Sequence, residues 1–219
     1  MIPLNKIKTV FFDYDGTLHD SIKIYAPAFR SAYDFLVNEG LAKEREWSDK
    51  EISYWLGFTP QNMWKSFMPY LQDELKEKCS SIISEEMKMS ISEGRPVLYD
   101  GAIEVLEYLK NKGYRLIFIS NCKIYYKEAH KKLFNLDKYF ERLICSEEFS
   151  FIQKHEILRI IKDEYPKDMV IIGDRYQDIE AGKKNGIYTI GCSYGYTQDG
   201  ELKEADLIID NIMELKKCL

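Results

Sequence analysis

The chain has 219 residues, of which 45% are hydrophobic and 31% are charged, so it can form one large domain or a core domain with an insert. Its 12 glycines and 6 prolines are too few for a collagen-like or low-complexity protein, and the composition excludes a disordered chain. Thirty-one basic residues stand against 36 acidic ones, giving a net charge of −5 without a dense basic run. Nucleic-acid binding is therefore not expected.

The five cysteines are widely spaced and form no Cys-x-x-Cys motif, which disfavours both a disulfide framework and a thiolate metal site. The first residues lack the apolar stretch and cleavage site of a signal peptide. No apolar run reaches the roughly 18 residues that a membrane span needs. We therefore expect a soluble, cytoplasmic protein with no membrane partner. The sequence carries no signal for an oligomeric state.

Short apolar runs alternate with helix-period segments, a pattern that predicts a parallel sheet covered by helices. The expected strands are Thr9–Phe12, Arg115–Ser120, Arg142–Cys145, Met169–Gly173, Ile187–Gly191 and an edge strand at Leu207–Ile209. The expected helices are Ala102–Lys112, Ile124–Phe134, His155–Glu164 and Gln177–Asn185. Gly113 and Gly186 are placed to end helices in the left-handed conformation. The fold class is therefore α/β.

Residues 19–94 interrupt this alternation and are too many for a loop. Apolar residues from Ile22 to Val37 recur at three- to four-residue steps, with Asp20 or Ser21 as a candidate N-cap and Gly40 just past the end. A second apolar stripe runs from Leu75 to Met87. The segment is thus predicted to be a small helical domain inserted into a core of residues 1–18 and 95–219. Its aromatic residues favour packing over substrate binding; they are Tyr54, Trp55, Phe58, Trp64 and Phe67.

Carboxylates follow two of the predicted strands. Asp13 and Asp15 come after the first strand, and Asp174 and Asp178 come after the fourth. Each pair alone also fits a turn or a helix cap. Ligands of open parallel sheets bind beyond the carboxyl ends of the strands, however, and four carboxylates gathered there would repel one another unless a cation lay among them. A set of oxygen ligands without Cys or His predicts a hard ion, and Mg²⁺ is the one that accepts a phosphate oxygen.

Three further polar residues are expected at the same edge of the sheet. Ser120 and Asn121 end the second strand, and Lys154 opens the helix before the fourth. A hydroxyl, adjacent backbone N–H groups and an ammonium group are suited to binding phosphoryl oxygens. The pattern therefore predicts a phosphate-binding site.

This ordered set resembles the haloacid dehalogenase superfamily of phosphatases across essentially the whole chain. The family's Asp-x-Asp-Gly-Thr motif is matched by Asp13–Thr17, its Ser or Thr after an apolar strand by Ser120, its lysine by Lys154, and its Gly-Asp-x-x-x-Asp motif by Gly173–Asp178. The insert is similar to the helical cap of the first cap class, seen in phosphoglycolate phosphatases and beta-phosphoglucomutases. The resemblance implies a Rossmann-like core domain carrying this cap.

The resemblance also implies a role for each residue. Asp13 would be the nucleophile that becomes an aspartyl phosphate, and Asp15 would protonate the leaving oxygen and then activate water. Asp13, the backbone carbonyl of Asp15 and Asp174 would hold Mg²⁺. Asp178 would support them through water or by orienting Lys154.

Three positions depart from the family pattern, and one of them, Asp100 where proline is frequent, affects only a turn. Lys154 precedes His155, where the family often has proline, so Lys123 remains an alternative for the phosphate-binding lysine. His19 stands where an aliphatic residue is common, and a hinge or packing role is favoured over a catalytic one.

The predicted function is Mg²⁺-dependent hydrolysis of a small phosphate monoester. A sugar phosphomutase, which returns the phosphoryl group to its substrate, and a non-catalytic phosphate-binding module on the same fold are the alternatives. Asp15 disfavours dehalogenases, which lack this aspartate, and phosphonatases, which carry a small residue there. Phosphoglycolate, sugar phosphates and nucleoside monophosphates all remain open as substrates.

Overall fold

The structure is a computed structural model that describes residues 6–219. The chain divides into two compact units. One contains the residues up to Asp20 and from Leu98 to the C-terminus, and the other is Ser21–Val97. The sequence pattern placed the same two transitions slightly earlier, after residues 18 and 94.

A six-stranded parallel sheet forms the centre of the first unit, with the strand order β3-β2-β1-β4-β5-β6. The strands are β1 (Thr9–Phe12), β2 (Arg115–Ser120), β3 (Arg142–Cys145), β4 (Met169–Gly173), β5 (Tyr188–Cys192) and β6 (Leu207–Ile209). Phe12 of β1 pairs with Phe118 of β2 on one side and with Ile172 of β4 on the other. The chain that leaves β1 therefore emerges between the carboxyl ends of β2 and β4.

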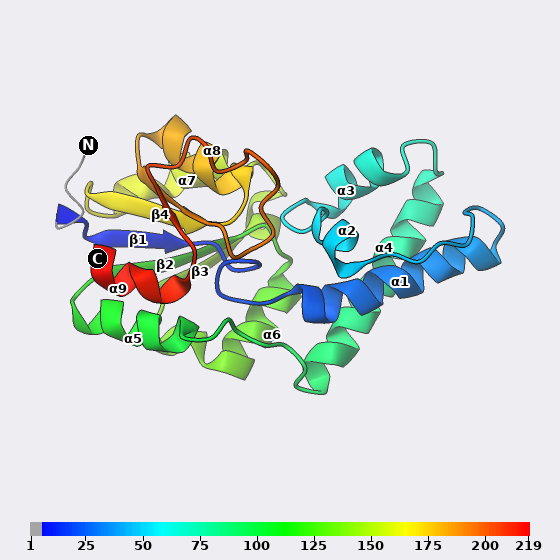
Figure 1. Ribbon diagram of the computed structural model, residues 1–219, viewed down its shortest axis with the longest axis horizontal. Helices are drawn as coiled ribbons and strands as arrows, with labels where there is room; N and C mark the ends of the chain where they lie inside the picture. The colour runs from blue at the N-terminus through cyan, green and yellow to red at the C-terminus, as the bar shows by residue number, and fades with distance from the viewer. Residues whose placement is uncertain (1–5) are drawn as a thin grey trace. The chain divides into compact units, whose positions relative to one another are not determined.

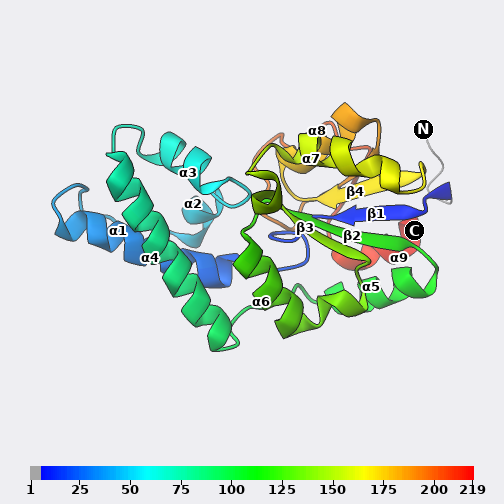
Figure 2. The same ribbon diagram turned by 180° about the vertical axis from the view of Figure 1, so that it is seen from behind.

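Helices cover both faces of this sheet. They are α5 (Ala102–Asn111), α6 (Ile124–Phe134), α7 (Lys154–Ile161), α8 (Tyr176–Asn185) and α9 (Leu215–Cys218). Short 3₁₀ helices lie at Leu136–Lys138, Ser146–Phe149, Lys162–Glu164 and Ile212–Glu214. Helices α5, α6 and α9 lie on one side of the sheet, and α7 and α8 lie on the other (Figures 1 and 2).

The strands are apolar because both faces of the sheet are buried. Every residue of β1 and of β4 is buried. On the side of α7 and α8, one core cluster joins sheet and helices; it includes Phe11, Ile117, Ile144, Ile157, Leu158, Ile171 and Ala181. The ring of Phe11 meets that of Tyr165 edge to face at 5.6 Å. This packing fixes the strand ends on which the polar residues stand.

The predicted α/β fold is confirmed, with small shifts at the ends of elements. Strand β5 begins and ends one residue later than predicted, and α7 and α8 each begin one residue earlier. The predicted helix to Glu164 continues past Ile161 as a 3₁₀ turn. Gly113 and Gly186 have φ values of 88° and 66°, so the left-handed helix ends were predicted correctly.

The second unit is helical. It contains α1 (Ile22–Asn38), α2 (Asp49–Ser53), α3 (Pro60–Phe67) and α4 (Asp73–Ser92). Helices α1 and α4 pack along each other. The unit has its own apolar core, made of Ala28, Ala32, Leu36, Met63, Trp64, Cys79 and Ile83. Trp55, Phe58 and Phe67 pack against this core, which agrees with the packing role predicted for them, whereas Tyr54 is 40% exposed.

Both helices that the sequence pattern predicted for this unit are present. Gly40 follows α1 with a φ of 70°, as expected for the residue after a helix. Ser21 precedes α1, but its side chain makes no capping hydrogen bond. Ser48 and Thr59 do cap the helices that follow them, through side-chain oxygens that accept from Glu51 N and Asn62 N.

Within residues 6–219, no helix is both long enough and apolar enough to cross a membrane.

Candidate active site

Three buried carboxylates meet at the carboxyl edge of the sheet. Asp13 directly follows β1, Asp174 directly follows β4, and Asp178 lies in the first turn of α8. One oxygen from each can be chosen so that all three lie within 4.8 Å of one another. The three residues come together because β1 and β4 are neighbours in the sheet. We call Asp13, Asp174 and Asp178 the carboxylate cluster.

Lys154, the first residue of α7, reaches into this cluster. Its ammonium nitrogen lies 2.6 Å from Oδ1 of Asp13 and 2.6 Å from Oδ1 of Asp178. The lysine is only 4% exposed, so both ion pairs are shielded from water. Lys154 therefore contacts Asp13 directly, and whether Lys154 or Lys123 binds the phosphate stays a prediction.

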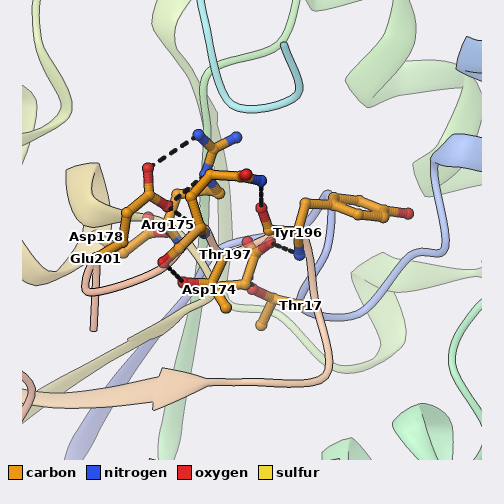
Figure 3. A network of polar contacts seen from close by, with 8 residues as sticks. Thr17, Asp174, Arg175, Asp178, Tyr196, Thr197 and Glu201 are labelled. Carbon is orange, nitrogen blue, oxygen red and sulfur yellow. Dashed lines mark hydrogen bonds and ion pairs between the residues drawn. The ribbon is translucent and has the colours of Figure 1, made fainter. Parts of the chain in front are cut away.

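The carboxylate of Asp174 is held from two sides (Figure 3). The backbone N–H of Tyr196 donates to its Oδ2 at 2.6 Å. The hydroxyl of Thr17 lies 3.5 Å from its Oδ1 and 3.4 Å from Oδ2 of Asp13. Thr17 thereby links the two aspartates that end neighbouring strands.

Two glycines allow the backbone to come this close to Asp174. Gly16 has a φ of 87°, and a Cβ at this position would overlap the Asp174 carboxylate. A Cβ on Gly195 would overlap the carbonyl oxygen of Gly16 and the side chain of Asp174. The loop after β5 therefore packs directly on the Asp-x-Asp-Gly-Thr segment, and only glycine fits at these two positions.

The buried Arg175 forms its ion pair with a carboxylate outside the cluster. Its guanidinium makes a two-point contact with Glu201, through Nε at 2.9 Å and Nη2 at 3.1 Å (Figure 3). Its backbone N–H donates to Oδ2 of Asp178 at 3.1 Å. The ammonium of Lys154 bonds directly to two members of the cluster, Asp13 and Asp178.

Burial of this excess negative charge changes the pKa values of the cluster. Burial raises the pKa of Asp13 to about 7, and the charge of Asp178 adds to the effect although Lys154 opposes it. Burial, together with the charges of Asp13 and Asp178, raises the pKa of Asp174 well above its usual range. Burial alone would lower the pKa of Lys154, but the two ion pairs outweigh it and raise that pKa.

The cluster therefore fits a bound cation. Its donors are all carboxylate oxygens, which are the ligands that hard divalent ions prefer. A cation among them would offset the negative charge that Lys154 leaves uncompensated. Asp13, Asp174 and Asp178 are the residues that would hold it.

The side chain of Asp15 is not part of the carboxylate cluster. Its Oδ1 accepts a hydrogen bond from the hydroxyl of Tyr126 at 2.7 Å and lies 3.1 Å from Nδ1 of His19. Burial would raise the pKa of Asp15, but the hydrogen bonds and charge of His19 and the hydroxyl of Tyr126 outweigh it and lower that pKa. The expected metal contact of Asp15 through its backbone carbonyl stays a prediction.

Ser120 and Asn121 lie at the end of β2, the strand beside β1. The side chain of Ser120 is buried, at 2% exposure. The strand register places Ser120 opposite Cys145 of β3. Both residues therefore stand at the sheet edge that carries Asp13, and their role in phosphate binding stays a prediction.

The fold and the site together define an α/β protein with acidic groups and a lysine gathered beyond the carboxyl ends of a parallel sheet. Residues 10–192 match the model of the haloacid dehalogenase-like hydrolase family. The chain therefore belongs to this family. The resemblance inferred from the four motifs, and with it the prediction of a hydrolytic enzyme, is confirmed.

Individual relatives cover nearly the whole chain. The phosphoglycolate phosphatase of Haemophilus influenzae strain Rd is 25% identical over 231 residues, covering 98% of this chain and 99% of the relative. The phosphoglycolate phosphatase of Aquifex aeolicus is 29% identical, covering 88% and 87%. Among solved structures, a predicted phosphatase from Clostridium acetobutylicum matches with a TM-score of 0.82 at 22% identity, covering 96% of this chain and 97% of the other.

Proposed function

We propose that this protein is a Mg²⁺-dependent phosphatase that hydrolyses a small phosphate monoester through an aspartyl phosphate on Asp13. The observation that carries the proposal is the convergence of Asp13, Asp174 and Asp178 with Lys154 at one edge of the sheet. A carboxylate nucleophile, a cation site and a fixed ammonium group are the groups that phosphoryl transfer needs.

Asp13, Asp174 and Asp178 are proposed to hold the Mg²⁺, together with the backbone carbonyl of Asp15 that the family resemblance implies. A bound divalent ion would neutralise charge on the phosphoryl oxygens and on the carboxylates around them. This charge balance allows an anionic substrate to approach a buried, negatively charged site.

The first half of the reaction transfers the phosphoryl group to the protein. A carboxylate oxygen of Asp13 attacks phosphorus, the ester P–O bond breaks, and a protonated Asp15 gives its proton to the leaving oxygen. Lys154, Ser120 and the backbone N–H groups near Asn121 bind the other phosphoryl oxygens. The ion pair with Lys154 also keeps the Asp13 carboxylate in place.

The second half regenerates the protein. Asp15, now a carboxylate, accepts a proton from water as the water oxygen bonds to phosphorus and the bond to Asp13 breaks. Such acid–base help is worth about 10²–10⁴-fold, whereas phosphate monoester hydrolysis requires up to about 10²¹. Positioning and charge neutralisation must therefore supply most of the acceleration.

The relatives suggest which substrates to test first. Two of them are phosphoglycolate phosphatases that cover most of this chain. We therefore propose a small phosphate monoester as the substrate class and 2-phosphoglycolate as its first candidate. A phosphomutase would rearrange a sugar phosphate without net release, so stoichiometric accumulation of inorganic phosphate separates the two reactions.

The test is phosphate release across a panel of 2-phosphoglycolate, sugar phosphates and nucleoside monophosphates, first with Mg²⁺ and then with chelator. We expect release that requires Mg²⁺ and is abolished by Asp13→Asn. Asp163→Asn, at an exposed position in a 3₁₀ turn, is the matched control and should keep full activity. Turnover by Asp13→Asn, or turnover that chelator leaves unchanged, would contradict the mechanism.

A further inference from the structure

The carboxylate of Asp15 is held by one of its two oxygens. Oδ1 receives the Tyr126 hydroxyl at 2.7 Å and faces Nδ1 of His19 at 3.1 Å. Oδ2 accepts no hydrogen bond from any residue in the described part of the chain, 6–219. The Asp15 side chain is 19% exposed. One oxygen is therefore anchored inside the protein while the other is available for proton exchange.

The three side chains form a closed triangle of hydrogen bonds. The Tyr126 hydroxyl has a single proton and donates it to Asp15, so its oxygen can accept from Nδ1 of His19 at 3.0 Å. Nδ1 of His19 must then carry a proton, which it shares between Oδ1 of Asp15 and the Tyr126 oxygen. This tautomer is the one that satisfies all three contacts.

Both donors are themselves immobilised. His19 is fully buried, and its backbone bridges to Asp15 on one side and to Leu98 on the other. The ring of Tyr14 stacks on the His19 ring at 5.2 Å with an interplanar angle of 14°. Because the His19 ring is held in this position, its Nδ1 can approach Asp15 from only one direction.

Tyr126 is fixed in the same way. It lies on α6, is 4% exposed, and stacks on the ring of His130 at 4.1 Å. Nδ1 of His130 is held in turn by the Tyr14 hydroxyl at 2.7 Å. The hydroxyl of Tyr126 therefore cannot turn away from Asp15 without disturbing a packed aromatic cluster.

We propose that His19 and Tyr126 are positioning residues that hold Asp15 by Oδ1 and leave Oδ2 to exchange the proton with the leaving group and with water. This inference rests on the proposed function, in which Asp15 is the acid and base. Small displacements of a proton-transferring group reduce rates strongly, so locking its orientation contributes directly to catalysis. His19, for which the sequence favoured a hinge or packing role, thus has a second task.

The test uses the dependence of rate on the leaving group. An alkyl alkoxide needs a proton as the P–O bond breaks, whereas 4-nitrophenolate leaves without one. The kcat/KM value reports the steps up to phosphoryl transfer to Asp13. We expect Tyr126→Phe to lower kcat/KM for an alkyl phosphate by about 10- to 100-fold and that for 4-nitrophenyl phosphate by less than about 3-fold.

Tyr14→Phe is the matched control. It removes a hydroxyl from the same buried cluster, but one that bonds to His130 and not to Asp15. Because Tyr14 reaches Tyr126 only through His130, its effect on the preference between the two esters should be much smaller than that of Tyr126→Phe. For the other donor, His19→Asn keeps an N–H near the position of Nδ1 and should retain more alkyl phosphatase activity than His19→Leu.

The outcomes separate this inference from the function on which it rests. Asp15→Asn should show the same preference for the activated ester, more strongly than Tyr126→Phe. Suppose that Asp15→Asn shows this preference while Tyr126→Phe lowers kcat/KM equally for both esters or leaves both values unchanged. The positioning role is then wrong and the proposed function stands. If His19→Asn and His19→Leu retain the same alkyl phosphatase activity, His19 does not position Asp15. A wild-type protein that hydrolyses neither ester in Mg²⁺ would overturn both the function and the inference.

Discussion

Lys154 and Asp13 stand 141 residues apart in the sequence, yet the ammonium nitrogen of Lys154 lies 2.6 Å from Oδ1 of Asp13 in a buried ion pair. The same nitrogen is also 2.6 Å from Asp178. Helix α7 thus supplies a positive charge to carboxylates that the end of β1 and the start of α8 carry. Charges buried in this way stabilise the protein only as a set, because removing one partner leaves the others uncompensated.

Replacement of this lysine should affect both stability and activity. In chelator we expect Lys154→Met to lower the free energy of unfolding by about 3–5 kcal/mol, the usual loss when a buried ion pair is broken. The kcat/KM value for phosphate esters should fall by at least about 100-fold, because Asp13 loses its anchor and the phosphoryl group loses a cation. Urea unfolding and phosphate release measure the two effects.

A second buried lysine provides the control for this experiment. Lys127 is 5% exposed and pairs with Glu148 at 2.7 Å, outside the carboxylate cluster. Lys127→Met should therefore destabilise the protein but leave kcat/KM near the wild-type value. Wild-type kcat/KM in Lys154→Met would show that Lys154 has no catalytic importance.

Asp174 offers a test of the cation site that does not depend on turnover. In chelator, Asp174→Asn should unfold at higher urea concentration than the wild type, because it removes a carboxylate whose burial raises its pKa well above the usual range. In Mg²⁺ the wild type should unfold at a higher urea concentration than Asp174→Asn. A ligand present at about 100 times its dissociation constant stabilises the folded state by about 2.7 kcal/mol, and the variant should gain little of this.

The control for this crossover is Asp163→Asn, which should respond to Mg²⁺ as the wild type does. Equal stabilisation of wild type and Asp174→Asn by Mg²⁺ would place the bound ion elsewhere.

The sequence was informative about the sheet because buried parallel strands are short apolar runs, and their ends could be read to within one residue. Asp13 and Asp174 follow two such runs, and the strand order makes β1 and β4 neighbours. Their meeting could therefore be predicted from pattern and topology. Lys154 was predicted from its place before the fourth strand, at the start of a helix that packs over the same sheet.

The contacts made by loops and by side chains outside the motifs could not be predicted. The backbone N–H of Tyr196 reaches Asp174 from a loop after β5, and a backbone donor has no residue-specific signal. Tyr126 reaches Asp15 across 111 residues because of the direction in which its helix presents the ring. A hydroxyl on an amphipathic helix face is equally consistent with ordinary packing. His19 was singled out as unusual, but only the structure shows its contact with Asp15.

The close packing of Gly195 on Gly16 and Asp174 predicts a large effect from one methyl group. Gly195→Ala would place a Cβ against the Gly16 carbonyl and the Asp174 side chain, so one of them must move. We expect a reduction of at least about 10-fold in kcat/KM and a weaker response of the unfolding midpoint to Mg²⁺. Titration of activity and stability with Mg²⁺ measures both.

Gly40→Ala is the control, because it introduces backbone strain without a steric collision of the added Cβ. Gly40 has a φ of 70°, but a Cβ added there would meet no atom within 4 Å, so alanine should cost about 1–3 kcal/mol of stability and no activity. If Gly195→Ala matched the wild type in its Mg²⁺ titration, the loop after β5 would have no influence on Asp174.

His130 should make the protein sensitive to mild acid. Burial, together with the nearby His19, lowers the pKa of His130 to about 3 from 6.5, so the folded state holds it neutral while the unfolded state takes up a proton. Its contribution to stability is therefore complete above pH 6.5 and is lost as the pH falls from 6.5 towards 3, by about 1.4 kcal/mol per pH unit.

The measurement is urea unfolding of wild type and His130→Gln in chelator at pH 7, 6 and 5. The variant should be less stable at pH 7, because glutamine does not fill the space of a buried imidazole that stacks on Tyr126. Acidic groups with raised pKa values, such as Asp13, titrate in both proteins. Their contribution therefore cancels when the free energies of unfolding of the two proteins are subtracted. The difference in free energy of unfolding between the two proteins should therefore narrow by about 2 kcal/mol between pH 7 and pH 5. A gap that stays constant over this range would mean that His130 is already able to take up a proton in the folded protein.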